Sequence, residues 1–157
     1  MKHAKIIIFI LLGLCSCMPE PENTNIPDRP VNFLIDVSLS GPDNLLHDGN
    51  IGISKIYTKQ HPATLSHYGS YGYSGVIVVR TWDNILCAFD ICCTHEAKAE
   101  YKLQQDGDGD YFLHCPACGS EFEVGNGLGI VNKGPAIQRL KRYKVEQRGS
   151  EKYYIRN

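Results

Sequence analysis

Two short segments stand close together in this chain, Cys93-Thr94-His95 and Cys115-Pro116-Ala117-Cys118-Gly119-Ser120-Glu121-Phe122, and residues 96–114 separate them. The Cys-x-His and Cys-x-x-Cys spacings let nearby side chains converge on one point from a tight turn. Three thiols and one imidazole make a complete ligand set for a soft or borderline metal. The sequence therefore predicts a metal site whose ligands are Cys93, His95, Cys115 and Cys118.

The other cysteines and the histidine nearest this site are expected to have different roles. Adjacent side chains in an extended chain point in opposite directions, so either Cys92 or Cys93 should face the metal, but not both. His114 is expected to point away from the metal for the same reason, because Cys115 follows it. The odd number of cysteines after residue 17 argues against a framework of disulfides alone. Cys87 and Cys92 are interpreted as packed thiols or a local disulfide.

The body of the chain has the pattern of an all-β domain. Residues 31–39 are apolar at every odd position, which is the period of a half-buried strand. Residues 75–80 and 85–90 are predicted as a buried strand and its return strand, and residues 139–156 as a closing hairpin. A calcium loop that starts at Asp106 would need glycine at position 111 and glutamate at position 117, where this chain has Tyr111 and Ala117. The Asp-Gly repeat over residues 106–110 is therefore predicted as a hairpin turn. No amphipathic helix or internal repeat is evident.

Composition narrows the functional classes. The formal net charge is −1 and no basic run occurs, which argues against nucleic-acid binding. The sequence offers no defensible nucleophile arrangement, mononuclear iron triad or small-molecule substrate pocket. We therefore do not expect a stand-alone enzyme.

The N-terminal residues resemble a bacterial lipoprotein signal peptide, predicted over residues 1–16. Lys2 and Lys5 precede an apolar run over residues 6–14 that is too short to cross a bilayer. Small Ser16 precedes Cys17, which is the predicted lipidated residue, and an ordinary secretory leader is the alternative. Cys17 and the proline-rich stretch that follows it are predicted as a tether over residues 17–30. The β domain then occupies residues 31–157, anchored to a membrane of the bacterial cell envelope and facing the periplasm or the cell exterior.

The order of motifs is similar to that of a Rieske-type iron–sulfur domain, from the two ligand pairs through Gly134-Pro135-Ala136 to a terminal hairpin. This resemblance covers roughly residues 75–157. It implies a six-to-ten-stranded antiparallel β-sandwich with a small cluster-binding subdomain, whose loops span residues 92–98 and 114–122. It also implies a [2Fe-2S] cluster, with Cys93 and Cys115 on the inner iron and His95 and residue 118 on the outer iron. A domain of this kind is expected to be an electron-transfer module whose partner is an unidentified redox protein. Around the cluster, the resemblance assigns supporting positions to Gly119, Ser120, Phe122 and Pro135.

Three departures from the family pattern bear on the redox potential. Cys118 stands where the family has a second histidine ligand, and a thiolate adds negative charge to the outer iron. Phe122 stands where high-potential members have tyrosine. The disulfide of respiratory-complex members has no counterpart, because its positions fall at Lys98 and Ala117. All three predict a low-potential, ferredoxin-like centre.

Zinc is the alternative metal. Three cysteines and one histidine are a common structural zinc set, and a zinc-stapled structural or interaction lipoprotein would need no redox activity. Gly119, Ser120 and Phe122, together with Gly134-Pro135-Ala136, favour iron–sulfur over Zn²⁺.

Overall fold

The computed structural model describes residues 24–107 and 110–157, so the predicted signal peptide and Cys17 lie outside the described residues. The described chain is built from antiparallel β-strands and one 3₁₀ turn, η1 (Asn44–Leu46), as the sequence predicts for an all-β fold. None of its helices is long and apolar enough to cross a bilayer. The strands are β1 (Val31–Asp36), β2 (Ser54–Tyr57), β3 (Ser70–Tyr71), β4 (Val76–Arg80), β5 (Leu86–Asp90), β6 (Phe112–His114), β7 (Glu121–Glu123), β8 (Ile130–Lys133), β9 (Arg142–Gln147) and β10 (Lys152–Arg156).

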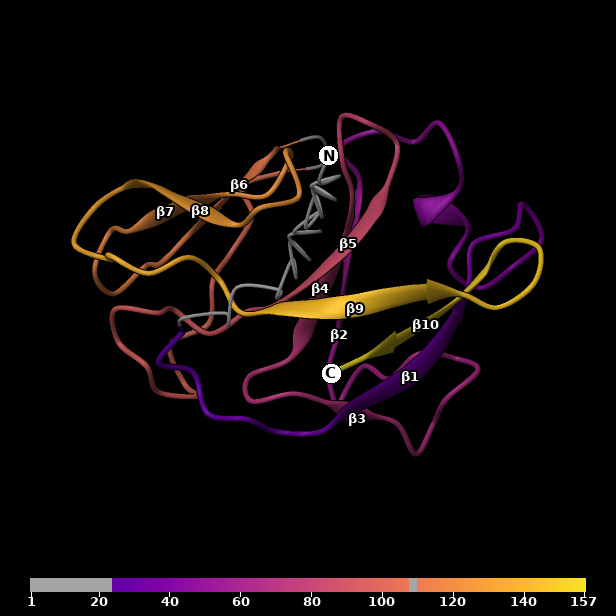
Figure 1. The fold of residues 1–157 in the computed structure, drawn as a ribbon, viewed down its shortest axis with the longest axis horizontal. Helices are drawn as coiled ribbons and strands as arrows, with labels where there is room; N and C mark the ends of the chain where they lie inside the picture. The colour runs from indigo at the N-terminus through magenta and orange to yellow at the C-terminus, as the bar shows by residue number, and fades with distance from the viewer. Residues whose placement is uncertain (1–23, 108–109) are drawn as a thin grey trace, which may run out of the picture.

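These strands form a large sheet and a small one (Figure 1). The large sheet has the order β2-β4-β5-β9-β10-β1-β3, and β9 joins its two halves by pairing with both β5 and β10. The small sheet has the order β6-β7-β8 and lies to one side of the large sheet in Figure 1. The predicted antiparallel fold with a small subdomain is confirmed.

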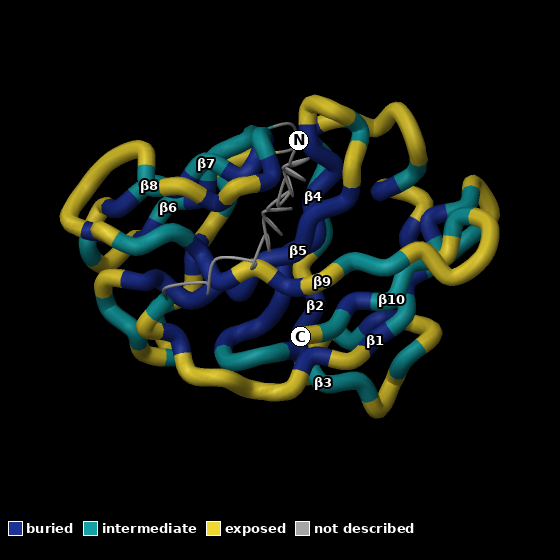
Figure 2. The backbone as a smooth tube through the Cα atoms, in the orientation of Figure 1, coloured by how far each residue is buried: buried dark blue, intermediate teal, exposed yellow. Residues whose placement is uncertain are grey.

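Strands β4 and β5 are buried on both faces, because each face packs against a different core. Val76 and Val78 point into a core inside the large sheet, where they pack with residues of β1 and β10. Ile77 and Val79 point to the opposite face, into a second core shared with β6 and β7. Figure 2 shows both strands as buried along their length. The continuous apolar run that predicts a buried strand here reflects these two separate cores.

The first strand is shorter than its alternating pattern predicts. β1 ends at Asp36, whose side-chain oxygen Oδ1 accepts bonds from the Ser38 backbone N–H at 3.1 Å and the Ser38 hydroxyl at 2.6 Å. An aspartate that binds the backbone two residues ahead makes a turn, which ends the strand. The predicted closing hairpin is present, because β9 and β10 pair antiparallel from Tyr153↔Gln147 to Arg156↔Lys144.

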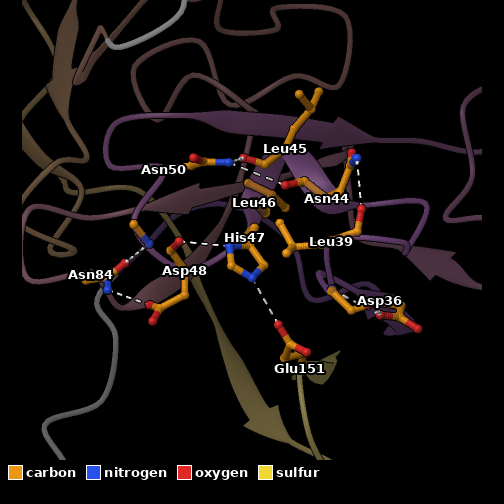
Figure 3. A network of polar contacts seen from close by, with 12 residues as sticks. Asp36, Leu39, Asn44, Leu45, Leu46, His47, Asp48, Asn50, Asn84 and Glu151 are labelled. Atoms are coloured by element: carbon orange, nitrogen blue, oxygen red, sulfur yellow. Dashed lines mark hydrogen bonds and ion pairs between the residues drawn. The ribbon is translucent and has the colours of Figure 1, made fainter.

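Polar contacts tie down the connection between β1 and β2 (Figure 3). His47 Nε2 lies 3.1 Å from a carboxylate oxygen of Glu151, in the turn between β9 and β10. Asn84 Oδ1 accepts a bond from the Gly49 backbone N–H at 3.0 Å, which links the connection to the turn between β4 and β5. These side chains hold loops rather than strands, so residues 45–53 show little hydrophobic periodicity.

Residues 24–30, which the sequence places in the tether, pack against the domain. Ile26 is buried, and Lys141 Nζ donates to its carbonyl oxygen at 3.3 Å. At the other end of this segment, Asn157 Nδ2 donates to the Arg29 carbonyl oxygen at 3.2 Å. The proline-rich composition predicts a tether over residues 17–30, but its described part, from residue 24, is docked on the domain. Specific backbone contacts and one buried side chain outweigh that composition.

Candidate metal centre

The first ligand loop begins directly after β5 and closes on itself. Cys92 and Lys102 form an antiparallel bridge across its base, and the Cys93 N–H donates to the Tyr101 carbonyl oxygen at 3.0 Å. Within the loop, the Ala97 N–H donates to the Cys93 carbonyl oxygen at 2.8 Å. Cys93 and His95 therefore occupy a compact loop whose ends are held by backbone bonds.

The second ligand loop connects β6 to β7. His114 and Glu121 pair across the two strands, so Cys115 begins the loop and Ser120 ends it. The Cys115 N–H donates to the Ser120 carbonyl oxygen at 2.8 Å, and the Gly119 N–H donates to the Cys115 carbonyl oxygen at 2.9 Å. Gly119 has φ of +73°, a conformation that glycine adopts without steric cost. The glycine after the second cysteine thus lets the loop close tightly.

The turn after β8 supports this second loop from outside. A Cβ atom on Gly134 would lie 2.5 Å from Ser120 Cα, so only glycine allows this approach. The Ala136 N–H donates to Ser120 Oγ at 3.0 Å. Pro135 itself is exposed, and its two neighbours make these contacts. The turn predicted as a supporting element therefore reaches the site through Ser120.

The two loops bring three of the four predicted ligands together. The Sγ atoms of Cys93, Cys115 and Cys118 all lie within 4.8 Å of one another, and Cys93 Sγ is 3.6 Å from Cys118 Sγ. Cys93 and Cys115 are buried, whereas Cys118 is partly exposed. The His95 side chain is exposed and is not part of this thiol group, so its ligation stays a prediction. Buried Phe122 packs in the same core as Cys93 and Cys115.

The thiols differ in their tendency to ionise. Burial raises the pKa of Cys93 to about 12, although the nearby backbone N–H groups of Glu96 and His95 oppose this shift. Burial also raises the pKa of Cys118, but bonds from the Ser120 side chain and backbone outweigh it and leave that pKa below its ordinary value. Ser120 Oγ accepts from the Ala136 N–H and, 3.1 Å away, from the Cys118 thiol; with Cys118 ionised, the Ser120 hydroxyl would instead donate to its sulfur. The site thus offers hydrogen-bond donors to negatively charged sulfur.

The neighbouring cysteines and histidine lie as the alternation of side chains predicts. Cys92 Sγ contacts the Lys98 carbonyl oxygen at 3.3 Å and does not belong to the three-thiol group. His114 Nδ1 lies 3.5 Å from an Asp106 carboxylate oxygen. Cys87 and Cys92 are both buried free thiols, which confirms the packed-thiol interpretation over a local disulfide.

Sequence reasoning missed a set of contacts around Thr94, the residue between Cys93 and His95. Thr94 Oγ1 donates to the Gln138 carbonyl oxygen at 2.7 Å, and Asn25 Nδ2 donates to the Thr94 carbonyl oxygen, also at 2.7 Å. Both partners are far from Thr94 in the sequence. Ile26, an apolar residue within a polar, proline-rich stretch, is the local signal in the sequence for docking of this segment.

Comparison with known proteins places both ligand loops within one recognised family. The model of the Rieske [2Fe-2S] domain matches residues 54–144, which is more than half of the chain. A chain from the solved complex of reduced oxygenase and oxidized ferredoxin in carbazole 1,9a-dioxygenase is similar at a TM-score of 0.46 and 18% identity, covering 82% of this chain and 94% of that one. No curated protein sequence matches significantly. From the match over residues 54–144, the chain belongs to the Rieske [2Fe-2S] domain family.

Proposed function

We propose that this chain is a one-electron-transfer protein that holds its [2Fe-2S] cluster with Cys93, Cys115, Cys118 and His95. A Rieske domain binds such a cluster and uses it for electron transfer. The observation that carries the ligand assignment is the convergence of three thiols from two loops that are distant in sequence. His95 completes the set as the fourth ligand because it lies two residues after Cys93 on the same loop.

The surroundings of the thiols fit such a cluster. Buried Cys93 and Cys115 suit the inner iron, and partly exposed Cys118 with exposed His95 suits the outer iron. The backbone N–H groups near Cys93 Sγ, and the Ser120 hydroxyl beside Cys118 Sγ, favour negative charge on sulfur. When bound, the cluster supplies a centre that gains or loses one electron. The protein contributes the ligands, the hydrogen-bond donors and a core that limits the access of water.

A low potential is the expected property of this centre. Cys118 adds a thiolate charge to the outer iron, and charge is one of the factors that set cluster potentials. Phe122 is buried and carries no hydroxyl that could donate toward the cluster. Low potential and the loss of one histidine ligand both argue for a ferredoxin-like role rather than quinol oxidation.

Replacing Cys118 with histidine is expected to raise the potential while the cluster persists. A neutral imidazole removes one negative charge, and the two-cysteine, two-histidine set differs from an all-cysteine set by several hundred millivolts, so roughly 100 mV or more is expected for one exchange. Redox titration of the native and C118H proteins measures the difference. An intact cluster with an unchanged potential would remove Cys118 from the ligand set.

The lipoprotein features give this activity a location. With Cys17 lipidated, the chain up to residue 24 spans at most about 25 Å when fully extended, so the domain stays near the lipid surface. The domain then exchanges electrons with a membrane or extracytoplasmic redox protein of the cell envelope. Acyl-chain labelling of the native and C17S proteins tests the anchor, because only the native chain should incorporate lipid.

Spectroscopy of the purified full-length chain tests the cluster assignment. After expression with iron and sulfide and anaerobic purification, about two irons per chain, visible absorbance and a reduced-state electron paramagnetic resonance signal are expected. The three sulfurs are also close enough for a single zinc ion, whose tetrahedral Zn–S bonds of about 2.3 Å would place sulfurs about 3.8 Å apart. Stoichiometric zinc without visible absorbance would therefore replace the redox function by a structural one.

A further inference from the structure

The segment before β1 reaches the first ligand loop through specific polar contacts. Asn25 Nδ2 donates to the Thr94 carbonyl oxygen at 2.7 Å, and the Asn25 backbone N–H donates to Gln138 Oε1 at 2.9 Å. Thr94 Oγ1 in turn donates to the Gln138 carbonyl oxygen at 2.7 Å. Three segments that are far apart in the sequence therefore meet in a closed set of hydrogen bonds, immediately between Cys93 and His95.

The residues that follow Asn25 hold its segment against the domain. Ile26 is only 3% exposed, so its side chain anchors the segment in apolar surroundings. Lys141 Nζ, on a side chain that is itself 8% exposed, donates to the Ile26 carbonyl oxygen and forms an ion pair with Asp28. The segment is thus held on both its backbone and its side chains where it approaches Thr94.

The Thr94 carbonyl oxygen is the point where this segment acts on the ligand loop. Thr94 is covalently between Cys93 and His95, so a shift of its peptide group moves the backbone from which both side chains project. Polar backbone groups of buried segments need partners, and Asn25 supplies the partner for this one. Thr94 itself is buried, although His95 beside it is exposed.

We infer that residues 24–28 form a strap over the first ligand loop, in which Asn25 is a positioning residue for the Cys93–His95 segment. The strap limits the movement of the loop that carries the proposed outer-iron ligand His95. Only the expected effect of the strap on the cluster rests on the proposed function, because the hydrogen bonds themselves join residues of this chain.

Two asparagine variants of the full-length chain separate this role from general loosening. N25A removes the donor to Thr94 and keeps the backbone bond from residue 25 to Gln138. N157A is the matched control, because Asn157 holds the far end of the same segment by donating to Arg29 and accepting from the Val31 N–H.

Amide hydrogen exchange of the purified full-length protein, with the metal that it carries, is the primary measurement. N25A should speed exchange in residues 93–98 by about two- to tenfold, the effect of losing one hydrogen bond that stabilises the closed loop. The Ala97 N–H, which bonds to the Cys93 carbonyl oxygen at 2.8 Å, is its reporter. N157A should speed exchange near Val31 and leave residues 93–98 unchanged. Unchanged exchange of residues 93–98 in N25A, or equal acceleration in both variants, would overturn the inference.

The cluster-loaded protein gives a second readout. N25A should broaden or shift the reduced-state electron paramagnetic resonance signal relative to the native and N157A proteins, because the His95 segment samples more conformations. An identical signal in N25A would show that the strap does not position the cluster. If the protein instead carries zinc, the exchange experiment still decides whether the strap exists, so failure of the proposed function and failure of the strap remain distinguishable.

Discussion

Replacing Cys93 with serine is expected to abolish cluster binding, whereas the same replacement at Cys92 is expected to preserve it. Cys93 Sγ lies in the three-thiol group, and a hydroxyl is a poor substitute for a thiolate that binds iron. Cys92 Sγ contacts the Lys98 carbonyl oxygen instead. The two variants alter adjacent residues with the same chemistry, so they differ in the direction of the side chain and in little else.

Iron content and visible absorbance measure this contrast. C93S should retain background iron only, and C92S should retain close to the native amount. C92S exchanges a buried thiol for a hydroxyl, so a modest loss of stability is compatible with the expectation as long as the loaded fraction is normal. Cluster loss in C92S with retention in C93S would reverse the assignment of the inward-facing cysteine.

Replacing Phe89 with alanine is expected to destabilise the domain by about 3–5 kcal/mol, the usual cost of removing a fully buried aromatic ring. Phe89 is fully buried in the core between the large and the small sheet, which also contains Cys93 and Cys115. Its ring lies against Gly129, where an added Cβ atom would be 2.9 Å from a ring carbon. Loss of this ring removes packing between the sheet and the subdomain that carries the second ligand loop.

Urea denaturation of the metal-free protein gives the free energy of unfolding. I137A is the control, because Ile137 is 93% exposed and truncation of such a side chain changes stability by about 0.5 kcal/mol or less. A loss in F89A no larger than in I137A would contradict the two-core arrangement. In the cluster-loaded protein, F89A should also release iron faster, since the core that supports both ligand loops is less well packed.

Local patterns in the sequence determined several elements of the fold correctly. The apolar run of residues 75–80 predicts a buried strand, and β4 occupies residues 76–80 within it. The hairpin predicted near the C-terminus is present as β9 and β10. Boundaries were less predictable, because β1 ends at Asp36 through a side-chain bond to Ser38 that the alternating pattern does not encode.

The ligand spacing likewise determined the core of the candidate site. Cys93, Cys115 and Cys118 were singled out from seven cysteines by spacing and by resemblance, and their sulfurs converge in the structure. The alternation of neighbouring side chains predicts that Cys92 and His114 point away from the three-thiol group, as they do in the structure. These predictions succeed because short spacings constrain where nearby side chains can point.

Only the tertiary structure decided how distant segments meet. It places Gly134 against Ser120, divides the two faces of β4 between separate cores, and docks Asn25 onto Thr94. Asn25 and Thr94 are sixty-nine positions apart in the chain. Spacing and periodicity report on neighbouring residues, whereas contacts over such separations depend on the packing of the whole domain. The sequence alone therefore identified the three cysteines that converge and the class of fold, and the packing decided what supports them.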